Sequence, residues 1–220
     1  MHILALNPNS STTVTASMAR ALAPLEAATH HQITCTECSE APLGIESDED
    51  VALAARSVAD FAKGTTADAL VVACFSDPGV AEVRARPDSP VVVGIAEAAY
   101  YTALQHGERF GIISIGPASI LRHAVHVARL GLTARFAGDR ALGMSVAQAN
   151  DPDQAMARVH RAAVQLRKMD GADVLILGCA GLAEQRAALQ SVLGCVVIDP
   201  VQAGVAAAIT ALDLSYTRGA

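Results

Sequence analysis

The sequence predicts an α/β protein of two pseudo-symmetric domains, each a four-stranded, mainly parallel sheet flanked by helices, with a ligand site in the cleft between them. Apolar β-rich stretches alternate with longer amphipathic ones, as in successive βα units. Most of the apolar stretches are uninterrupted, as expected of strands that are covered on both faces. The spacing also repeats, because Asn7 to Cys74 spans 67 positions and Ser114 to Cys179 spans 65.

The expected strands are eight short apolar runs, in two groups of four. In open parallel sheets, ligands bind beyond the carboxyl ends of the strands, so two like-folded halves direct their loops at one cleft. The runs lie at residues 2–6, 32–36, 69–73, 91–93, 110–114, 133–136, 174–177 and 196–198.

Helix signals occupy the segments between these runs. Residues 47–50 (Ser-Asp-Glu-Asp) resemble a capping box that opens a helix ending at Gly64. Asp151 and Pro152 supply an N-cap and a first-turn proline for another helix. Further helix ends are expected near Gly107, Gly131 and Gly171.

The length of 220 residues allows one domain or two compact half-sized domains. We expect residues 1–97 plus 200–220 to form the first domain and residues 98–199 to form the second. Apolar residues make up 52% of the chain and charged residues 17%, a balance that excludes low-complexity disorder.

Charge and hydropathy exclude two classes of partner. The net charge is −6 and the basic residues are scattered singly, so we expect no binding of nucleic acid. No apolar run approaches the roughly 18–20 residues that span a bilayer, so we expect no membrane partner. The first seven residues lack the features of a secretory signal, and five cysteines fit a reducing compartment, so we expect a cytoplasmic location.

Cys74 and Cys179 occupy equivalent places in the two halves. Each follows a buried strand and precedes a turn of small or polar residues, Phe-Ser-Asp-Pro-Gly in the first case and Ala-Gly in the second. We expect both thiols at helix N-termini, where free N–H groups and the helix dipole lower the thiol pKa from about 8.5 toward neutrality. A single buried cysteine usually has only a packing role, but two cysteines in matching positions indicate a catalytic pair.

The other cysteines and the histidines carry weaker signals. Cys35 and Cys38 have the spacing of a zinc or redox pair but no second ligand pair, so we interpret them as structural, and Cys195 as core. His123 and His126 have no carboxylate partner in a metal motif, and we expect them on a surface or half-buried helix face. The His-His pair at residues 30–31 is expected to be solvated. No metal site is predicted.

A polar loop follows the first strand and reads Asn-Pro-Asn-Ser-Ser-Thr-Thr at residues 7–13. Helix capping accounts for one of these residues. The others suggest that the loop also holds the carbonyl groups or the carboxylate of a small ligand. No Walker lysine or GxGxxG motif accompanies the loop, which argues against a phosphate site.

Four motifs in this order resemble the aspartate/glutamate/hydantoin racemase superfamily, in its hydantoin and allantoin racemase branch. The motifs are Leu-Asn-Pro-Asn-Ser-Ser at residues 6–11, Ala-Cys-Phe-Ser-Asp-Pro-Gly at 73–79, Val-Gly-Ile-Ala-Glu-Ala-Ala at 93–99, and Leu-Gly-Cys-Ala-Gly at 177–181. The resemblance covers nearly the whole chain. It implies two pseudo-symmetric α/β domains with one active site between them, and proton exchange by two cysteines without metal or pyridoxal.

The residues beside the cysteines separate the branches of this superfamily. Its amino-acid racemases typically have Cys-Asn-Thr and Cys-Thr-His, whereas this chain has Cys-Phe-Ser at residues 74–76 and Cys-Ala-Gly at 179–181. The resemblance therefore disfavours free aspartate or glutamate as the substrate. Hydantoin racemases commonly have Thr-Thr after the fifth strand, where this chain has Ser114 and Ile115.

The implied activity is cofactor-independent racemisation of a 5-substituted hydantoin or allantoin. Cys74 and Cys179 act as base and acid on opposite faces of the substrate. The enolate is stabilised by the backbone N–H groups of Phe75, Ser76, Ala180 and Gly181. Asp77 is expected mainly to brace the turn after Cys74. The substrate-binding residues are expected to be Asn7, Ser10, Phe75, Ser76, Asp77, Ser114, Ala180 and Gly181.

Three alternatives remain open at this point. One is a maleate isomerase-like or arylmalonate decarboxylase-like enzyme on the same fold, another is an aspartate or glutamate racemase, and the third is a binding protein without catalysis. The expected partners are a small hydantoin-like molecule and further copies of the chain in a homo-oligomer.

Overall fold

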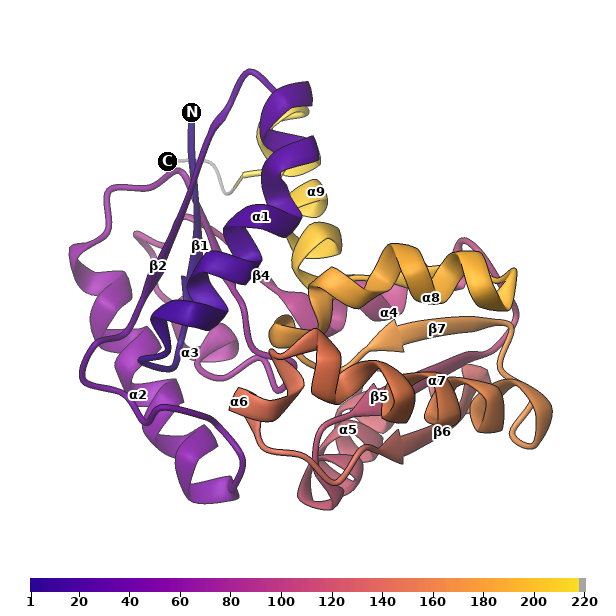
Figure 1. Cartoon of the computed structure of the whole chain (residues 1–220). Helices are drawn as coiled ribbons and strands as arrows, with labels where there is room; N and C mark the ends of the chain where they lie inside the picture. The colour runs from indigo at the N-terminus through magenta and orange to yellow at the C-terminus, as the bar shows by residue number, and fades with distance from the viewer. Residues whose placement is uncertain (218–220) are drawn as a thin grey trace.

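Two four-stranded parallel sheets form the centre of the protein in a computed structural model that describes residues 1–217 (Figure 1). The strand orders are β2-β1-β3-β4 and β6-β5-β7-β8, so the second sheet repeats the topology of the first. All pairings are parallel, and the predicted fold class is confirmed. The strands are β1 (His2–Asn7), β2 (Gln32–Glu37), β3 (Ala69–Val72), β4 (Val91–Gly94), β5 (Phe110–Ser114), β6 (Phe136–Ala141), β7 (Val174–Leu177) and β8 (Val197–Ile198).

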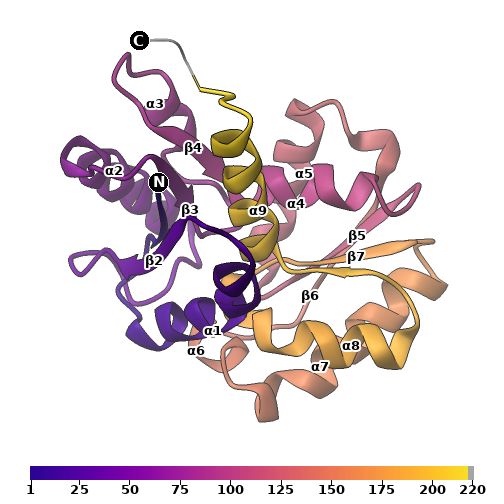
Figure 2. The ribbon, with the colours of Figure 1, turned by 90° about the horizontal axis from the view of Figure 1, so that it is seen from above.

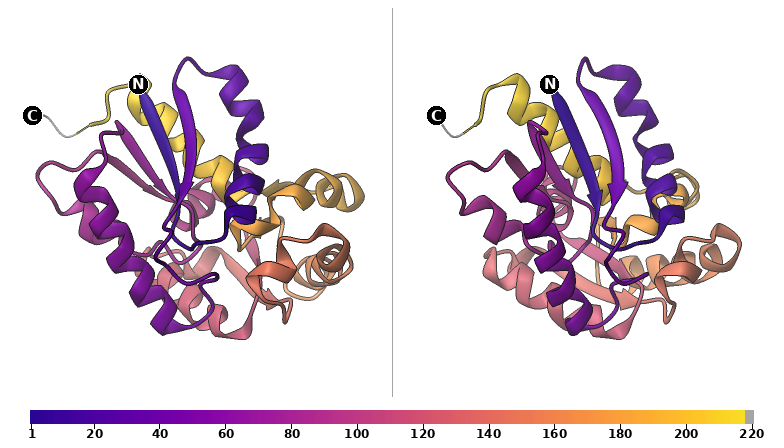
Figure 3. Two further views of the ribbon diagram at one scale, coloured as in Figure 1. Left: turned by 60° about the vertical axis from the view of Figure 1, so that its left-hand side comes forward. Right: turned by 90° about the vertical axis from the view of Figure 1, so that its left-hand side faces the viewer.

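Helices cover both faces of the first sheet, and Figure 3 shows α1 and α2 on opposite sides of β1 and β2. The alternation of side chains along β1 explains this, because Ile3 and Ala5 pack with α1 and α9, whereas Leu4 and Leu6 pack with α2 and α3. These helices are α1 (Thr12–Ala28), α2 (Asp48–Gly64), α3 (Val80–Arg84) and α9 (Pro200–Asp213).

The second sheet is covered in the same way. Phe110 and Ile112 of β5 pack with α4 and α5, while Ile113 packs on the side of α7 and α8. The elements of this half are α4 (Ile95–Leu104), α5 (Pro117–Arg129), α6 (Val146–Ala149), α7 (Pro152–Lys168), α8 (Arg186–Leu193) and the 3-10 helices η1 (Thr133–Arg135) and η2 (Ala180–Gln185).

The predicted helix signals are confirmed. Ser47 and Asp50 form a capping box at the start of α2, which ends at Gly64. Asp151 caps α7, and Pro152 is its first residue. The chain then leaves α5 and α7 through glycines with positive φ, Gly131 at 73° and Gly171 at 74°.

The prediction for the sixth strand is wrong. Residues 133–136 were expected to form it, but Thr133–Arg135 is a 3-10 helix and the strand runs from Phe136 to Ala141. The strand has the sequence Phe-Ala-Gly-Asp-Arg-Ala, whose Gly-Asp-Arg resembles a turn. Asp139 and Arg140 are compatible with a strand here because β6 is an edge strand and both side chains have partners.

The last helix connects the two halves. Figure 2 shows α9 at their junction, where it contacts β3 and β4 of the first sheet and also α4. The domain boundaries at residues 97 and 199 stay a prediction, and residues 218–220, assigned with the first domain, lie outside the described residues. Across residues 1–217 we find no helix with the length and hydropathy needed to cross a membrane.

Candidate active site

A small cavity lies beyond the carboxyl ends of the central strands, between the two sheets. Cys74 follows β3 and Cys179 follows β7, and both thiols line this cavity. Ile45 closes it from the first half and Val146 from the second. Its volume is about 40 Å³, enough for a few water molecules at the ~10–15 Å³ that each requires.

The two thiols have raised pKa values, contrary to the prediction. Burial raises the pKa of Cys74 to about 12 and that of Cys179 to about 11. Neither thiol lies at the start of an α-helix, because Cys74 leads into a turn before α3, and Cys179 precedes a 3-10 helix. The negative charge of a Cys179 thiolate also raises the pKa of Cys74.

Backbone N–H groups partly offset this cost of burial. The N–H of Ser76 donates to the sulfur of Cys74, and the N–H of Gly181 donates to that of Cys179, and each lowers the thiol pKa. The N–H groups of Ser76 and Gly181 therefore stabilise the thiolates. Of the four N–H groups expected to face an enolate, those of Phe75 and Ala180 remain, and both residues line the cavity.

Asp77 lies behind the first cysteine rather than in the cavity wall. Its carboxylate accepts from the N–H groups of Ala96 and Glu97, both at 2.9 Å, at the start of α4. Gly94 makes this possible, because a Cβ there would lie 2.3 Å from the carboxyl carbon of Asp77. Burial raises the pKa of Asp77 to about 7, although the two N–H groups lower it.

Besides Asp77 and Gly181, three further predicted site residues do not line the cavity. The amide of Asn7 is fully buried and donates to Asn9, Ser11 and Thr15, so it holds the loop together. The Oγ of Ser114 donates to Asp139 at 2.6 Å. Ser10 is half-buried, and its N–H donates to the carbonyl of Pro42.

A buried histidine that the sequence reading placed elsewhere lines the cavity. His123 is 2% exposed and its Nδ1 lies 2.8 Å from Asp139. His126 is also buried, and burial lowers its pKa to about 4, so the prediction of a surface or half-buried face is wrong for both. The available signal was the spacing of Ser119, His123, His126 and Val127, which share one face of α5.

Two contacts cross the mouth of the cavity. Arg122 lines the cavity from α5, and its Nη1 donates to Asp48 of the first half at 2.8 Å. The N–H of Val146 donates to Glu46 Oε1 at 2.8 Å. These contacts join the first residue of α2 and the loop before it to the second half, and no sequence motif predicted either contact.

Other clusters lie away from the thiols. His31 is buried and its Nε2 lies 2.9 Å from Asp213 Oδ1, so the prediction that it is solvated is wrong, whereas His30 is exposed. These three side chains have ligand atoms within 4.8 Å of one another, at the amino end of β2. Cys35 and Cys38 are free thiols, partly and fully buried.

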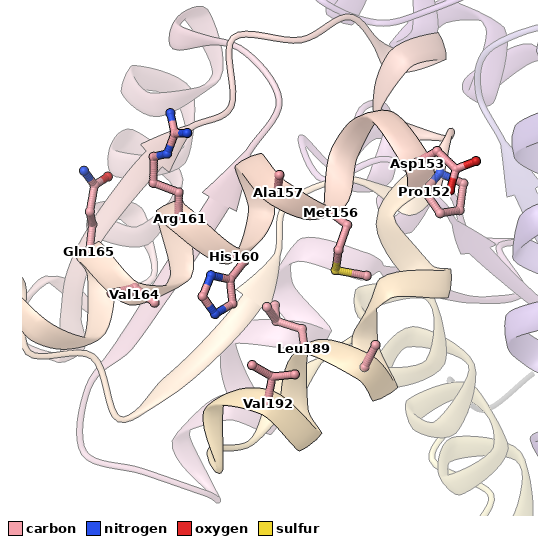
Figure 4. A pocket seen from close by; sticks show the side chains of 11 residues that line it. Pro152, Asp153, Met156, Ala157, His160, Arg161, Val164, Gln165, Leu189 and Val192 are labelled. Carbon is pink, nitrogen blue, oxygen red and sulfur yellow. The ribbon is translucent and has the colours of Figure 1, made fainter.

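A groove much larger than the cavity lies on the outer surface of the second half, between α7 and α8. It measures about 920 Å³, and Figure 4 shows Met156 and His160 of α7 facing Leu189 and Val192 of α8. This groove contains no cysteine and lies on the helices rather than at the strand ends. The small cavity therefore remains the candidate active site.

Comparison with known proteins gives matches over nearly the whole chain. Residues 3–208 match the sequence model of a family described as Asp/Glu/Hydantoin racemase. A hydantoin racemase from Paenarthrobacter aurescens is 37% identical, over 98% of this chain and 93% of that protein. A hydantoin racemase from Pseudomonas sp. (strain NS671) is 34% identical, over 97% and 87%. The structure of allantoin racemase from Klebsiella pneumoniae has a TM-score of 0.90 at 28% identity, over 98% of this chain and 89% of that chain.

Proposed function

We propose that this chain, a member of the Asp/Glu/hydantoin racemase family, interconverts the D and L forms of a 5-substituted hydantoin or of allantoin. Its family and relatives show that it is an isomerase. The observation that carries the proposal is the pair of thiols from equivalent strands, Cys74 after β3 and Cys179 after β7, at one cavity. The two sulfurs serve as base and acid on opposite faces of the substrate.

Racemisation of a carbon acid requires removal of a proton from one face and its replacement from the other. One cysteine acts as a thiolate and takes the hydrogen on C5 of the ring, while the other is a thiol and returns a proton to the opposite face. The roles exchange when the other enantiomer binds. The scheme needs no cofactor, because the two thiols make both proton transfers.

Negative charge develops on the carbonyl oxygen next to C5 once the proton has left. The N–H groups of Phe75 and Ala180, at the cavity wall, are the candidates for receiving this charge. A donor placed at such an oxygen lowers the barrier by about 3–4 kcal/mol. The hydrogen bonds of Asn7, Ser10 and Ser114, which do not line the cavity, then stabilise the shape of the site.

The activity is tested by polarimetry with enantiopure 5-alkyl hydantoins, allantoin, aspartate and maleate, under metal chelation. We expect the optical rotation of a hydantoin or of allantoin to decay to zero. Loss of CO₂, or a changed double bond in maleate, would instead support the decarboxylase or isomerase alternative.

The roles of the thiols are tested with Cys74→Ser and Cys179→Ser. We expect each substitution to lower racemisation by about 10²–10⁴-fold, while each variant still exchanges the C5 hydrogen of one enantiomer in deuterated water. Cys195→Ser is the matched control, because Cys195 is a free cysteine outside the cavity wall. Full racemisation by either cavity variant contradicts the two-thiol scheme.

Two expectations concern the setting of the enzyme, its cytoplasmic location and its assembly into a homo-oligomer. Both stay predictions. Light scattering of the purified protein tests the second, because an oligomer has a multiple of the 22.6 kDa mass of the chain.

A further inference from the structure

His123 lines the cavity of the two thiols, and one of its ring nitrogens makes no hydrogen bond to residues 1–217. It lies on α5, and its ring packs edge-on against Phe75 with centroids 5.0 Å apart. Its Nδ1 lies 2.8 Å from Asp139 Oδ2 and 3.1 Å from Ser114 Oγ. Within residues 1–217, Nε2 has no hydrogen-bond partner, so this is the nitrogen that a bound molecule meets.

The partners of Nδ1 determine which nitrogen carries the proton. An ionised carboxylate only accepts, and Asp139 accepts from Ser114 at 2.6 Å and from His123 at 2.8 Å. Nδ1 therefore carries a proton, and in the neutral form of the ring Nε2 carries a lone pair. The side chains of His123 and Asp139 are 3% and 1% exposed, so water does not compete for this arrangement.

This cluster is not a nucleophilic serine site. In such a site, the serine and the carboxylate bind opposite nitrogens of the histidine. Here Ser114 and Asp139 both lie at Nδ1, so His123 cannot take the serine proton on Nε2 and pass charge toward the carboxylate. The cluster instead fixes the orientation and the tautomer of the ring.

The other polar side chains at the wall offer few free acceptors. Arg122 has only donors, and its Nη2 donates to the Oγ of Ser119, while the hydroxyl of Ser76 can donate or accept. Asn9 lines the cavity as well, but its Oδ1 already accepts from Asn7 and from the N–H of Ser11. A cyclic ureide has N–H groups as well as carbonyl oxygens, and its N–H groups need acceptors.

We infer that His123 Nε2 accepts a hydrogen bond from a ring N–H of the substrate, with Asp139 as a positioning residue that holds the required tautomer. The inference rests on the proposed function and narrows it to substrates with an amide N–H beside the reacting carbon. A carboxylate substrate has no such hydrogen and meets the lone pair unfavourably.

The first test measures binding of 5,5-dimethylhydantoin, which has no hydrogen on C5 and cannot react. Calorimetry compares the wild type with His123→Asn, whose amide can still donate to Asp139 but lacks Nε2. We expect binding to weaken about ten- to hundredfold, since a ring N–H loses its acceptor. N-methylation of the ring at the contacted nitrogen should weaken binding to the wild type by a similar factor. The same methylation should change the affinity of His123→Asn little.

Equal affinity of the wild type and His123→Asn, or equal sensitivity to N-methylation, overturns the inference. This outcome is distinct from failure of the proposed function, which would appear as a wild type that binds hydantoins but leaves the C5 hydrogen unexchanged in deuterated water. Thermal unfolding of the variant verifies that it is folded.

The second test addresses Asp139 with Asp139→Asn. The new amide can donate to Nδ1, which moves the ring proton to Nε2 and removes the acceptor. We expect kcat/KM to fall about ten- to hundredfold and the ¹⁵N resonances of His123 to change from an unprotonated to a protonated Nε2. A protonated Nε2 in the wild type at neutral pH overturns the inference, and so does an unchanged kcat/KM in a variant with the altered tautomer.

Discussion

Each cavity thiol is subject to two opposing influences. Burial favours the neutral thiol, while a backbone N–H at each sulfur, from Ser76 or Gly181, favours the thiolate. Arg122 adds a positive charge that lowers the pKa of Cys74, but burial is the largest influence on both groups. At neutral pH both cysteines are therefore mainly protonated in the free enzyme.

The first prediction concerns pH and rate. The active form needs one thiolate and one thiol, and the pKa values of Cys179 and Cys74 are raised to about 11 and about 12. The thiolate fraction then grows as pH rises, so kcat/KM for racemisation should increase about tenfold per pH unit between pH 7 and 9. Initial rates by polarimetry give this profile, and a flat profile over that range contradicts it.

The site was predictable where a residue follows a strand directly. Cys74 and Cys179 stand at strand ends, so the topology alone brings them to one edge. His123 and Asp139 were missed because their partners are set by packing. On α5, the apolar Leu121 and Val125 are exposed at 73% and 60%, so hydrophobicity indicates the wrong face of this helix.

Among the secondary-structure elements, α4 depends on a residue from another part of the chain. Its first N–H groups are capped by Asp77, which comes from the turn after β3 rather than from the residue before the helix. The turn that carries Cys74 and the first helix of the second half are thus joined by one carboxylate. Asp77 itself has a positive φ of 47°.

The second prediction concerns this carboxylate. The folded pKa of Asp77, about 7, exceeds the ordinary value of 3.8, so between these pH values the folded state binds a proton that the unfolded chain does not. The contribution of Asp77 to stability therefore falls as pH rises from about 4 to 7. Asp77→Asn does not titrate, so the free energy of unfolding of the wild type relative to the variant should fall by about 2–4 kcal/mol from pH 4.5 to 8.

Urea unfolding of both proteins at the two pH values measures this difference. Because the other titrating groups are common to both chains, their effects cancel in the comparison. A difference in free energy that does not change with pH shows that Asp77 does not titrate as predicted.

The secondary structure was predictable from the sequence wherever apolar runs and helix caps were clear. Seven of the eight expected strands overlap the observed ones closely, and α2 and α7 begin at their predicted caps. The exception is β6. An edge strand can contain polar side chains when these have partners, and here the partners come from distant residues such as Asp170, which binds Arg140. The family resemblance, which rested on four motifs, is confirmed by the match over residues 3–208.

At the scale of the whole molecule, the two sheets share one core. A single hydrophobic cluster includes Ile3 and Val71 of the first sheet together with Ile113 and Leu175 of the second. Leu182 of η2 is fully buried in this cluster, in an element that contacts α1, α7, α8 and α9. The two halves are therefore coupled through η2, which begins directly after Cys179.

The third prediction follows from this shared core. Leu182→Ala should lower the free energy of unfolding by about 2–5 kcal/mol, and denaturant unfolding should remain one cooperative transition. The matched control is Leu121→Ala, at a side chain that is 73% exposed, with an expected change within about 0.5 kcal/mol. Two separate transitions, of which Leu182→Ala shifts only one, would show that the halves unfold independently.

The fourth prediction concerns access to the cavity. A cavity of about 40 Å³ is too small for a substituted five-membered ring, so the two halves must separate to admit one. A ring of this size holds the halves apart, so the N–H of Val146, which donates to Glu46 across the mouth, should exchange its hydrogen faster when 5,5-dimethylhydantoin is bound. Hydrogen exchange by NMR measures this, with an amide inside β7 as the reference, and unchanged exchange at Val146 contradicts opening at this point.

The chain begins and its last helix ends at the same side of the first sheet. His2 opens β1, and Asp213, the final residue of α9, bonds to His31 just before β2. This is the amino-terminal edge of the strands, whereas the thiols lie beyond the carboxyl-terminal edge. A tether attached at Met1 therefore holds the enzyme to a solid support with its reaction chamber turned outward, so immobilised protein should keep its substrate access.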